Sequence, residues 1–548
     1  MPNAVLKLDP KDNVLVALRD LRRGERIDFE GHTFELISDV PAKHKFSTEP
    51  FASGSNIIMY GVLVGTAREP IQRAELLSTR NIAHATSPFD ERGIRPTWIP
   101  PDVGPWPGRT FRGFFRSDGQ VGTRNYWIVV PLVFCENRNI HVLKQAFEEE
   151  LGFAPPQVYR RQLAELIRRH EEGKSTSLNL PSPNSSTALP RSPVFPNVDG
   201  VKFLTHEGGC GGTREDARNL CALIAGYIHH PNVAGATILS LGCQHSQIEI
   251  LQEEIHRRNP RFDKSLLIFD QQQTGSEFQM MSQAIRATFE GLIQANAATR
   301  SESSLSHLCV GLKCGGSDGF SGISANPALG RVSDILVTCG ARTILSEFPE
   351  LCGVEQNLID RSISSEVSAR FIHLMRDYAA RAIAARSALE MNPSPGNIKD
   401  GLLTDAMKSA GAARKGGTSP VTAVLDYPEY CTQSGLNLQC TPGNDVECVT
   451  AQTAAGASVV LFTTGLGTPT GNPIAPVIKI ATNTALARRM HDIIDLDAGP
   501  IIAGEKAIEE LADELLDLMV KIASGEQKTK AESLAQNDFI PWKRGVSL

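Results

Sequence analysis

The feature that most constrains the fold is a repeated pattern in which a short apolar run ends in a loop that carries a cysteine. Four such runs, each with the cysteine that comes after it, are 127–134 with Cys135, 201–205 with Cys210, 237–241 with Cys243 and 308–312 with Cys314. In an open α/β sheet, ligands bind beyond the carboxyl ends of the parallel strands, where side chains from separate strands meet. The pattern therefore predicts one polar pocket that the four cysteines share.

Glycine flanks the last three of these cysteines, most densely in residues 208–212 and 314–316. Because glycine lacks a Cβ, it lets the backbone come close to a bound ion or small anion. A single cysteine at a strand end is more often a core residue, since free cysteine ranks among the most buried residue types. Four cysteines at equivalent positions favour a site over core packing.

Length and composition restrict the class of protein. A chain of 548 residues exceeds one ordinary core, and a net charge of −6 leaves no strongly basic face for nucleic acid. The 11 cysteines are odd in number and widely spread, which does not indicate a disulfide framework. The first residues lack a signal-peptide pattern. No apolar run reaches the roughly 18 residues of a membrane helix. We expect a reduced, cytoplasmic protein without membrane or nucleic-acid partners; its oligomeric state stays open, a homodimer included.

Strand and turn signals divide the chain into segments. Short alternating strands up to residue 86 predict a small β domain, and the proline-rich stretch 87–110 predicts a linker. Strands that alternate with helical patterns predict one α/β domain over residues 111–300 and a second over 301–548, each with a mainly parallel sheet. The predicted fold class is therefore α/β, with a small β domain in front.

Three segments carry more specific predictions. Residues 174–197 are rich in Ser, Pro and Asn and predict a disordered surface insertion. Residues 365–391 predict a long helix that the prolines of 392–397 end. The periodicity of residues 505–524 predicts a helix on the outside of the second α/β domain.

His206, Glu207 and Cys210 lie close together in a glycine-rich loop directly after a strand. Imidazole, carboxylate and thiolate are all ligands for a borderline divalent metal, and His206 or Glu207 could also move a proton. The alternative is that these side chains hydrogen-bond a tight glycine turn.

Other loops after strands also carry polar side chains. A helix that starts near Ser246 would favour a substrate carboxylate at its N-terminus, with Gln247 bonding hydroxyls, unless Ser246 is no more than a helix cap. Asp318 could bind metal or orient a hydroxyl, but its loop lacks the Gly-Lys-Ser/Thr ending of a phosphate loop. A Rossmann fingerprint is absent too. Lys479 and Asn483 are later candidates, although loops are polar whether or not they function.

The sequence closely resembles the altronate dehydratase and galactarate dehydratase family over nearly the whole chain. The matching motifs are Gly119-x-Val121-Gly122-x-Arg124-Asn125, Gly242-Cys243 with Gln247, 311–319, Ala325-Asn326-Pro327, 392–397 and 479–483. Within the family, Gln271-Gln272-Gln273 and Gly353-x-Glu355-Gln356 are similar to the altronate branch.

The N-terminal part resembles the small β-clip domain, or SAF domain, of this family through Asp12-Asn13 and His44-Lys45-Phe46. The resemblance therefore implies a SAF-like domain followed by two α/β domains. Two features depart from the family pattern. Residues 174–197 are foreign to it, and Ala412 stands where a relative has cysteine, beside a matching Lys415.

The resemblance implies lyase chemistry: loss of water from a six-carbon aldonate or aldarate, with D-altronate as the expected substrate and a 2-keto-3-deoxy sugar acid as product. It also implies a divalent metal, usually Fe²⁺, with Mn²⁺ or Mg²⁺ as alternatives. The proton beside a carboxylate is only weakly acidic, so the enzyme must stabilise an enediolate. A base removes the C2 proton while an acid assists the departing C3 hydroxide.

The predicted site combines strand-end residues with the family motifs. The predicted metal ligands are Cys135, Cys210, Cys243 and Cys314. The predicted catalytic residues are His206, Cys210, Cys243, Cys314 and Asp318. The predicted substrate-binding residues are Arg124, Gln247, Ser317, Lys479, Asn483 and His44.

Several alternatives remain open at this point. The thiolates could hold an iron–sulfur cluster rather than a single ion. The chain could act on galactarate or sulfolactate through related enolate chemistry, or bind a sugar acid as a sensor without turnover. One inverted hydroxyl changes only a hydrogen bond or two, so the sequence does not set the stereochemistry of the substrate.

Overall fold

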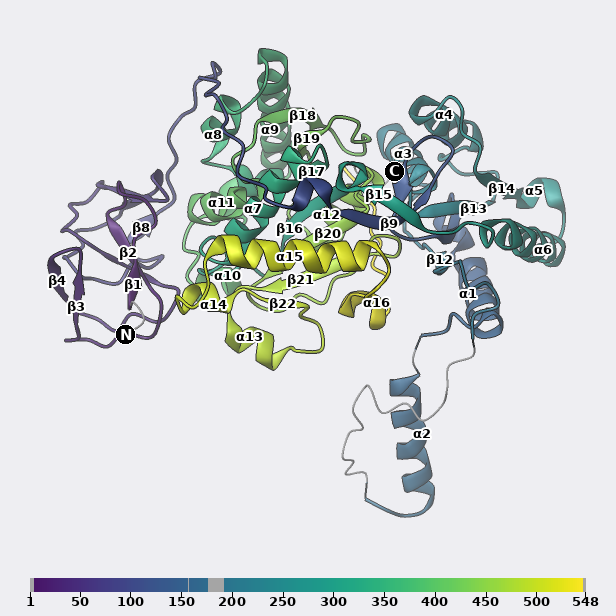
Figure 1. Ribbon diagram of the computed structural model, residues 1–548, viewed down its shortest axis with the longest axis horizontal. Helices are drawn as coiled ribbons and strands as arrows, with labels where there is room; N and C mark the ends of the chain where they lie inside the picture. Colours follow the sequence, from purple (N-terminus) through teal and green to yellow (C-terminus); the bar gives the residue numbers. More distant parts are fainter. Residues whose placement is uncertain (1–3, 156, 176–191, 546–548) are drawn as a thin grey trace.

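Short antiparallel strands separated by tight turns build the N-terminal domain. The computed structural model describes residues 4–155, 157–175 and 192–545, and this domain lies at one end of the molecule (Figure 1). Its strands are β1 (Val5–Leu6), β2 (Val14–Ala17), β3 (Arg26–Phe29), β4 (His32–Glu35), β5 (Lys45–Ser47), β6 (Asn56–Met59), β7 (Val62–Ala67) and β8 (Ile82–Ala83). They form the sheets β1-β2-β5, β3-β4 and β6-β7-β8, as the alternating sequence predicts.

A four-stranded parallel sheet of order β12-β11-β13-β14 forms the first α/β domain. Its strands are β11 (Tyr126–Pro131), β12 (Gly200–Phe203), β13 (Val233–Ser240) and β14 (Ser265–Asp270). Its helices are α1 (Asn137–Leu151), α2 (Val158–Glu171), α3 (Arg214–His229), α4 (Ile248–Arg258), α5 (Gln271–Thr274) and α6 (Glu277–Ala295). Because both faces of a parallel sheet are buried, α3 and α4 pack on one face and α1 and α6 on the other.

A seven-stranded parallel sheet of order β18-β19-β17-β16-β20-β21-β22 forms the second α/β domain. Its strands are β16 (Cys309–Cys314), β17 (Arg342–Leu345), β18 (Val421–Leu425), β19 (Gly435–Gln439), β20 (Val459–Thr464), β21 (Val477–Ala481) and β22 (Leu496–Asp497). Its helices are α7 (Ala325–Thr338), α8 (Glu355–Asp360), α9 (Ser365–Ala384), α10 (Pro395–Lys399), α11 (Asp405–Ala413), α12 (Asp445–Ala454), α13 (Thr484–Arg489), α14 (Gly499–Ile502), α15 (Ile508–Ala523) and α16 (Lys530–Ser533).

The order of these strands locates a crevice. From β16 the chain continues to β17 on one side, and it later returns to β20 on the other side of β16. In open parallel sheets such a switch of direction opens a ligand-binding crevice at the carboxyl ends of the two strands. Helices α7 and α15 cover one face of the sheet and α12 the other, so the crevice opens at the strand ends.

Whole secondary-structure elements pack together where the α/β domains meet. The antiparallel sheet β10-β9-β15, made of β9 (Thr110–Phe115), β10 (Val121–Gly122) and β15 (Ser301–Ser304), runs along their boundary. In addition, α3 of the first domain packs on α12 of the second. A Cβ on Gly226 of α3 would lie 2.3 Å from the carbonyl oxygen of Ala454, so the two helices touch through glycine.

The predicted fold class is confirmed, whereas two local predictions are wrong. Helix α9 ends at Ala384 rather than near residue 391, because Arg386 adopts a left-handed conformation with φ of 58°. Pro395 does not end that helix; it is the first residue of α10, where its fixed φ suits a helix start.

Residues 174–197 are predicted as a disordered insertion, and most of them, residues 176–191, lie outside the described residues. The last residues of this segment are packed, contrary to the prediction. The Phe195 side chain is buried with its ring centroid 5.3 Å from that of Phe289, and Asn197 Nδ2 donates to Asn296 O at 2.8 Å. Helix α2, which precedes the segment, buries none of its side chains and extends away from the rest of the molecule (Figure 1).

The helices in the described part of the chain include none that is both long and apolar enough to cross a membrane.

Replacing Gly226 by alanine should weaken the contact between the two α/β domains. Alanine is normally preferred over glycine in a helix by about 1 kcal/mol. Here its Cβ would clash with Ala454 O, and we expect a net loss of about 1–3 kcal/mol. Urea denaturation followed by circular dichroism measures the change. Gly108→Ala, whose Cβ would meet nothing within 4 Å, is the control. A Gly226→Ala midpoint equal to that of the control would contradict the close contact.

Candidate functional site

A cavity of about 410 Å³ lies at the carboxyl ends of β16 and β20, where the strand order predicts a crevice. The residues of its wall that matter for chemistry are Cys314, Gly316, Ser317, Glu350, Lys408 and Asp445. A Cβ on Gly315 would lie 2.5 Å from the Asp445 carboxylate, so this loop needs glycine there. The cavity therefore combines a glycine loop with two carboxylates, a thiol and an ammonium group.

Buried charges lie directly behind this cavity. Glu347, at the end of β17, is fully buried and adopts a left-handed conformation with φ of 70°. Its carboxylate contacts the ammonium groups of Lys313 and Lys415, and Lys313 Nζ also lies 2.9 Å from Asp445 Oδ1. Lys415 Nζ is 2.9 Å from Cys314 Sγ. A non-glycine residue held at positive φ is strained, and such residues cluster at functional sites.

These neighbours set the protonation states. Burial alone would lower the pKa of Lys415, but the neighbouring acidic side chains, Glu347 among them, raise it above its ordinary value. Burial raises the pKa of Cys314 to about 12, so Cys314 is a neutral thiol at neutral pH. The positive charge beside the thiol is therefore that of Lys415.

Glu350 and Lys408 form the ion pair that faces the cavity. Lys408 Nζ lies 2.8 Å from Glu350 Oε1 and donates to Asn392 Oδ1 at 2.7 Å, and Cys314 Sγ is 3.4 Å from Glu350 Oε2. Burial would raise the pKa of Glu350, but Lys408 and the other nearby lysines lower it to about 2. The pair is consequently ionised, with an ammonium group available to an anionic ligand.

Asp318 lies beyond the glycine loop and joins three parts of the chain. Its Oδ2 accepts from Thr482 Oγ1 at 3.0 Å and lies 3.0 Å from Lys43 Nζ, while its Oδ1 accepts from Ser321 Oγ at 3.0 Å. Asn483 Nδ2 is 3.4 Å from the same carboxylate. Asp318 and Asn483, both predicted for the site, therefore lie together, but they shape the loop rather than line the cavity.

The N-terminal domain contacts this region through residues 43–45. Lys43 Nζ bridges Asp318 and Asp400, at 3.0 and 2.8 Å, and Lys45 Nζ donates to Gly401 O at 2.7 Å. His44, predicted to bind substrate, has its Nε2 3.0 Å from Lys399 O, a backbone contact. The charged contacts from this segment are made by Lys43 and not by His44.

The four cysteines predicted to share one pocket do not lie at the edge of a single sheet. Cys314 belongs to the seven-stranded sheet and is buried among Glu350, Lys415 and Glu347. Cys135, Cys210 and Cys243 follow β11, β12 and β13 of the other sheet, and all three are exposed. The same local sequence pattern thus occurs at the edges of two different sheets.

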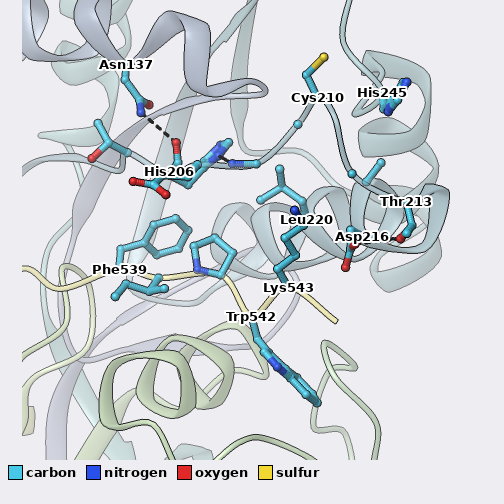
Figure 2. A pocket seen from close by; sticks show the side chains of 18 residues that line it. Asn137, His206, Cys210, Thr213, Asp216, Leu220, His245, Phe539, Trp542 and Lys543 are labelled. Atoms are coloured by element: carbon cyan, nitrogen blue, oxygen red, sulfur yellow. Dashed lines mark hydrogen bonds between the residues drawn. The ribbon is translucent and has the colours of Figure 1, made fainter. Parts of the chain in front are cut away.

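A second cavity, of about 570 Å³, lies beside the Cys210 loop, between α3 and residues 539–543 near the C-terminus (Figure 2). His206 lies in its wall, but both ring nitrogens are bonded to backbone: Nε2 to Pro131 O at 2.7 Å and Nδ1 to Gly208 N at 3.1 Å. Burial lowers the pKa of His206 to about 4, so the ring is neutral. In this structure the His206 ring holds the glycine turn, and its predicted acid–base role stays a prediction.

Three predicted substrate ligands have other partners. Arg124 is buried and pairs with Glu532, with Nε to Oε1 at 2.7 Å and Nη2 to Oε2 at 3.0 Å. Lys479 is buried against Gln536. Gln247 Nε2 contacts the carbonyl oxygen of Gln244 in its own turn. Each of these side chains supports local structure, so the substrate-binding roles predicted for them are not supported.

Sequence reasoning missed Glu350, Lys408, Glu347 and Lys43. A signal existed for Glu347, which follows a strand just as the cysteines do. Lys408 lies on helix α11 and does not follow a strand in the sequence. The residues next to it in the sequence give no sign of a site. Ser317, which was predicted, does line the cavity, and its carbonyl accepts from Asn397 Nδ2 at 2.8 Å.

A divalent metal does not fit the acidic group beside this cavity. Among the described residues, one set of three side chains brings ligand atoms within 4.8 Å of one another: Cys314, Glu347 and Glu350. Lys415 Nζ already contacts two of these ligands, at 2.9 Å from Cys314 Sγ and 2.5 Å from Glu347 Oε2. The ammonium group supplies the positive charge that a metal would bring, and a second cation there would be repelled.

Comparison with known protein families matches each domain of the chain. Residues 3–85 match the altronate/galactarate dehydratase SAF domain. Residues 113–296 match the second domain of D-galactarate dehydratase/altronate hydrolase, and residues 305–547 match the C-terminal D-galactarate/altronate dehydratase domain.

Three relatives align along almost their whole length. Altronate dehydratase of Bacillus subtilis is 33% identical over 99% of each chain. Altronate dehydratase of Escherichia coli is 32% identical over 99% of each chain. Galactarate dehydratase (L-threo-forming) of Escherichia coli is 32% identical over 96% of this chain and 93% of its own. The chain therefore belongs to the altronate/galactarate dehydratase family, which is a family of hydro-lyases.

Replacing Glu350 by glutamine should destabilise the protein in a pH-dependent way. Because the folded-state pKa is lowered, the carboxylate contributes stability above its ordinary pKa of 4.5 and loses it as the pH falls towards about 2. At neutral pH we expect Glu350→Gln to cost about 3 kcal/mol, since Lys408 is left without its counter-ion. The cost should shrink as acid neutralises the wild-type carboxylate.

Urea denaturation over this pH range measures the difference between Glu350→Gln and wild type. Glu514→Gln, which removes an exposed partner of Lys506, is the control and should cost less than about 1 kcal/mol. A cost for Glu350→Gln that stays constant as the pH falls would show that the carboxylate is not ionised in the folded protein.

Proposed function

We propose that this member of the family removes water from a six-carbon sugar acid, most specifically D-altronate, in the cavity at the carboxyl ends of β16 and β20. The observation that carries the proposal is the ionised Lys408–Glu350 pair, 2.8 Å apart, in the wall of a 410 Å³ cavity at the switch point of the sheet. A sugar acid is small, anionic and rich in hydroxyls, and this cavity is polar and of matching size.

Lys408 would bind the substrate carboxylate and then stabilise the enediolate. Loss of the C2 proton moves negative charge onto the carboxylate oxygens, so a fixed ammonium group beside them lowers the barrier. Acidic neighbours, Glu350 first among them, offset the effect of burial and raise the pKa of Lys408 above its ordinary value, so it stays charged at neutral pH. The hydrogen bond to Asn392 holds the ammonium in place.

Glu350 is the proposed base. In the free protein its pKa is held low by Lys408 and the other lysines, which makes it a weak base. A substrate carboxylate that binds Lys408 brings its own negative charge, so the pKa of Glu350 rises when substrate is present. The carboxylate thus gains basic strength at the moment when the C2 proton must be removed.

Cys314 is the proposed acid for the departing C3 hydroxyl. Its thiol lies 3.4 Å from Glu350 and 2.9 Å from the Lys415 ammonium. When the C3–O bond breaks, the thiol proton would complete a water molecule, and Lys415 would stabilise the thiolate left behind. The proton that Glu350 has taken from C2 can then restore the thiol, and the enol product tautomerises to the 2-keto acid.

Galactarate is the second candidate substrate, because a galactarate dehydratase is as similar to this chain as an altronate dehydratase is, at 32% identity. D-altronate has one carboxylate, whereas galactarate has two. A panel of hexonates and hexarates, with sulfolactate included, assayed for 2-keto acid formation distinguishes them. Binding of D-altronate without any product would instead support a sensor.

Lys408→Met should lower kcat/KM for the preferred sugar acid by at least about 10²-fold, and Glu350→Gln by about 10²–10⁴-fold. The first variant loses the charge that stabilises the enediolate, and the second loses the base. Lys506→Met, which removes a half-exposed lysine of a surface ion pair, is the matched control and should keep the wild-type rate. Wild-type turnover by a folded Lys408→Met protein would remove this cavity from the mechanism.

A further inference from the structure

We propose that helix α2 of one chain docks on helix α6 of a second copy of the same chain, and that two copies exchange this contact reciprocally. The starting observation is that α2 buries none of its side chains and extends away from the rest of the molecule, its own α6 included (Figure 1). The two helices therefore do not meet within one chain. This inference does not depend on the proposed function.

Helix α2 carries an exposed apolar stripe. Tyr159, Leu163 and Ile167 follow one another at intervals of four residues, which places them on one side of the helix, and they are 50–80% exposed. Isolated helices of 14 residues are only marginally stable in water. The ion pairs of Arg168 with Glu165 and Glu172 are exposed and contribute little. Packing of the apolar stripe against a partner would supply the stability that α2 lacks alone.

Helix α6 exposes a longer apolar stripe in the same domain. One side of this 19-residue helix packs on the sheet through residues such as Met280 and Leu292. The exposed apolar residues beside that buried side are Phe278, Ile285, Phe289 and Ile293. They are 41–80% exposed, and their spacing of seven, four and four residues places them on one side of the helix. Contiguous exposed apolar side chains mark contact surfaces.

The chain leaves for α2 and returns from it beside the α6 stripe. Val194 N donates to Leu151 O at 3.1 Å, so the residue that ends α1 and a residue after the α2 segment are held together. The next side chain, Phe195, packs on Phe289 of α6, with ring centroids 5.3 Å apart. Val194 is 46% exposed and enlarges the apolar surface. Each chain thus presents an apolar patch at the point from which its own α2 projects outwards.

The charges of the two helices favour α6 as the partner of α2. Helix α2 carries four arginines and two glutamates, whereas α6 carries two glutamates and one arginine. A basic helix is attracted to an acidic one, and two copies of α2 placed against each other would repel. The complementary charges therefore support a contact of α2 with α6 over a contact of α2 with α2.

A second copy of the chain satisfies both stripes at once. Each chain offers one α2 and one α6, so two chains form two equal contacts that a twofold axis relates. At 1.5 Å per residue, the α2 stripe is about 12 Å long and the α6 stripe about 22 Å, so the shorter stripe fits on the longer one. Reciprocal exchange covers the stripes of both chains and closes the assembly at two copies.

The test is the mass of the full-length protein in solution, measured by light scattering during size-exclusion chromatography. We expect the wild-type protein to have the mass of two chains. Leu163→Asp in α2 and Ile293→Lys in α6 should each reduce it to one chain, because each variant places a charge in both contacts of the dimer. Ile383→Asp, at an isoleucine of α9 that is 68% exposed, is the matched control and should stay at two chains. Circular dichroism checks that every variant is folded.

Mixing the two monomeric variants tests the pairing of the helices. In a mixed dimer of Leu163→Asp with Ile293→Lys, one contact is wild type and the other joins opposite charges at the two substituted positions. We expect the mass of two chains to return in the mixture, which a contact between two copies of α2 would not produce. A wild-type mass other than two chains, an unchanged mass in either variant, or a mixture that stays at one chain would overturn the proposal.

Discussion

The structure of the candidate active site depends on one carboxylate, that of Glu347, which is buried between two lysine ammonium groups. Glu347 follows β17, Lys313 lies on β16 and Lys415 comes from the segment after α11, so one set of ion pairs fixes three elements. An unpaired charge at this depth would cost several kcal/mol, which makes each member depend on the others. This buried set of ion pairs holds Cys314, Glu350 and Lys408 in position.

The small N-terminal domain adds a second set of charges on the other side of the glycine loop. Lys43 bridges Asp318 and Asp400, and Lys45 bonds the backbone of Gly401. The loop between β16 and α7 is therefore held from two sides, by the buried lysines and by the N-terminal domain. A site whose loop is held in this way needs little reorganisation when charge develops in the transition state.

The sequence predicted the architecture well, because periodicity and turn residues are local signals. It also named Ser317, which lies in the cavity wall, and Asp318 and Asn483, whose side chains meet next to the glycine loop. It failed where distant segments decide the outcome. Cysteines at strand ends look alike in sequence, yet Cys314 belongs to one sheet and Cys135, Cys210 and Cys243 to another. Similarly, the sequence around Lys408 gives no hint that helix α11 brings it to Glu350.

The central claim is that the sugar acid binds with its carboxylate against Lys408. The most direct measurement is a crystal structure of the Glu350→Gln protein with D-altronate bound. The account predicts the substrate carboxylate within hydrogen-bonding distance of Lys408 Nζ, with C2 facing residue 350. Substrate bound elsewhere, with its carboxylate paired to another cation and the cavity between β16 and β20 free of it, would contradict the account.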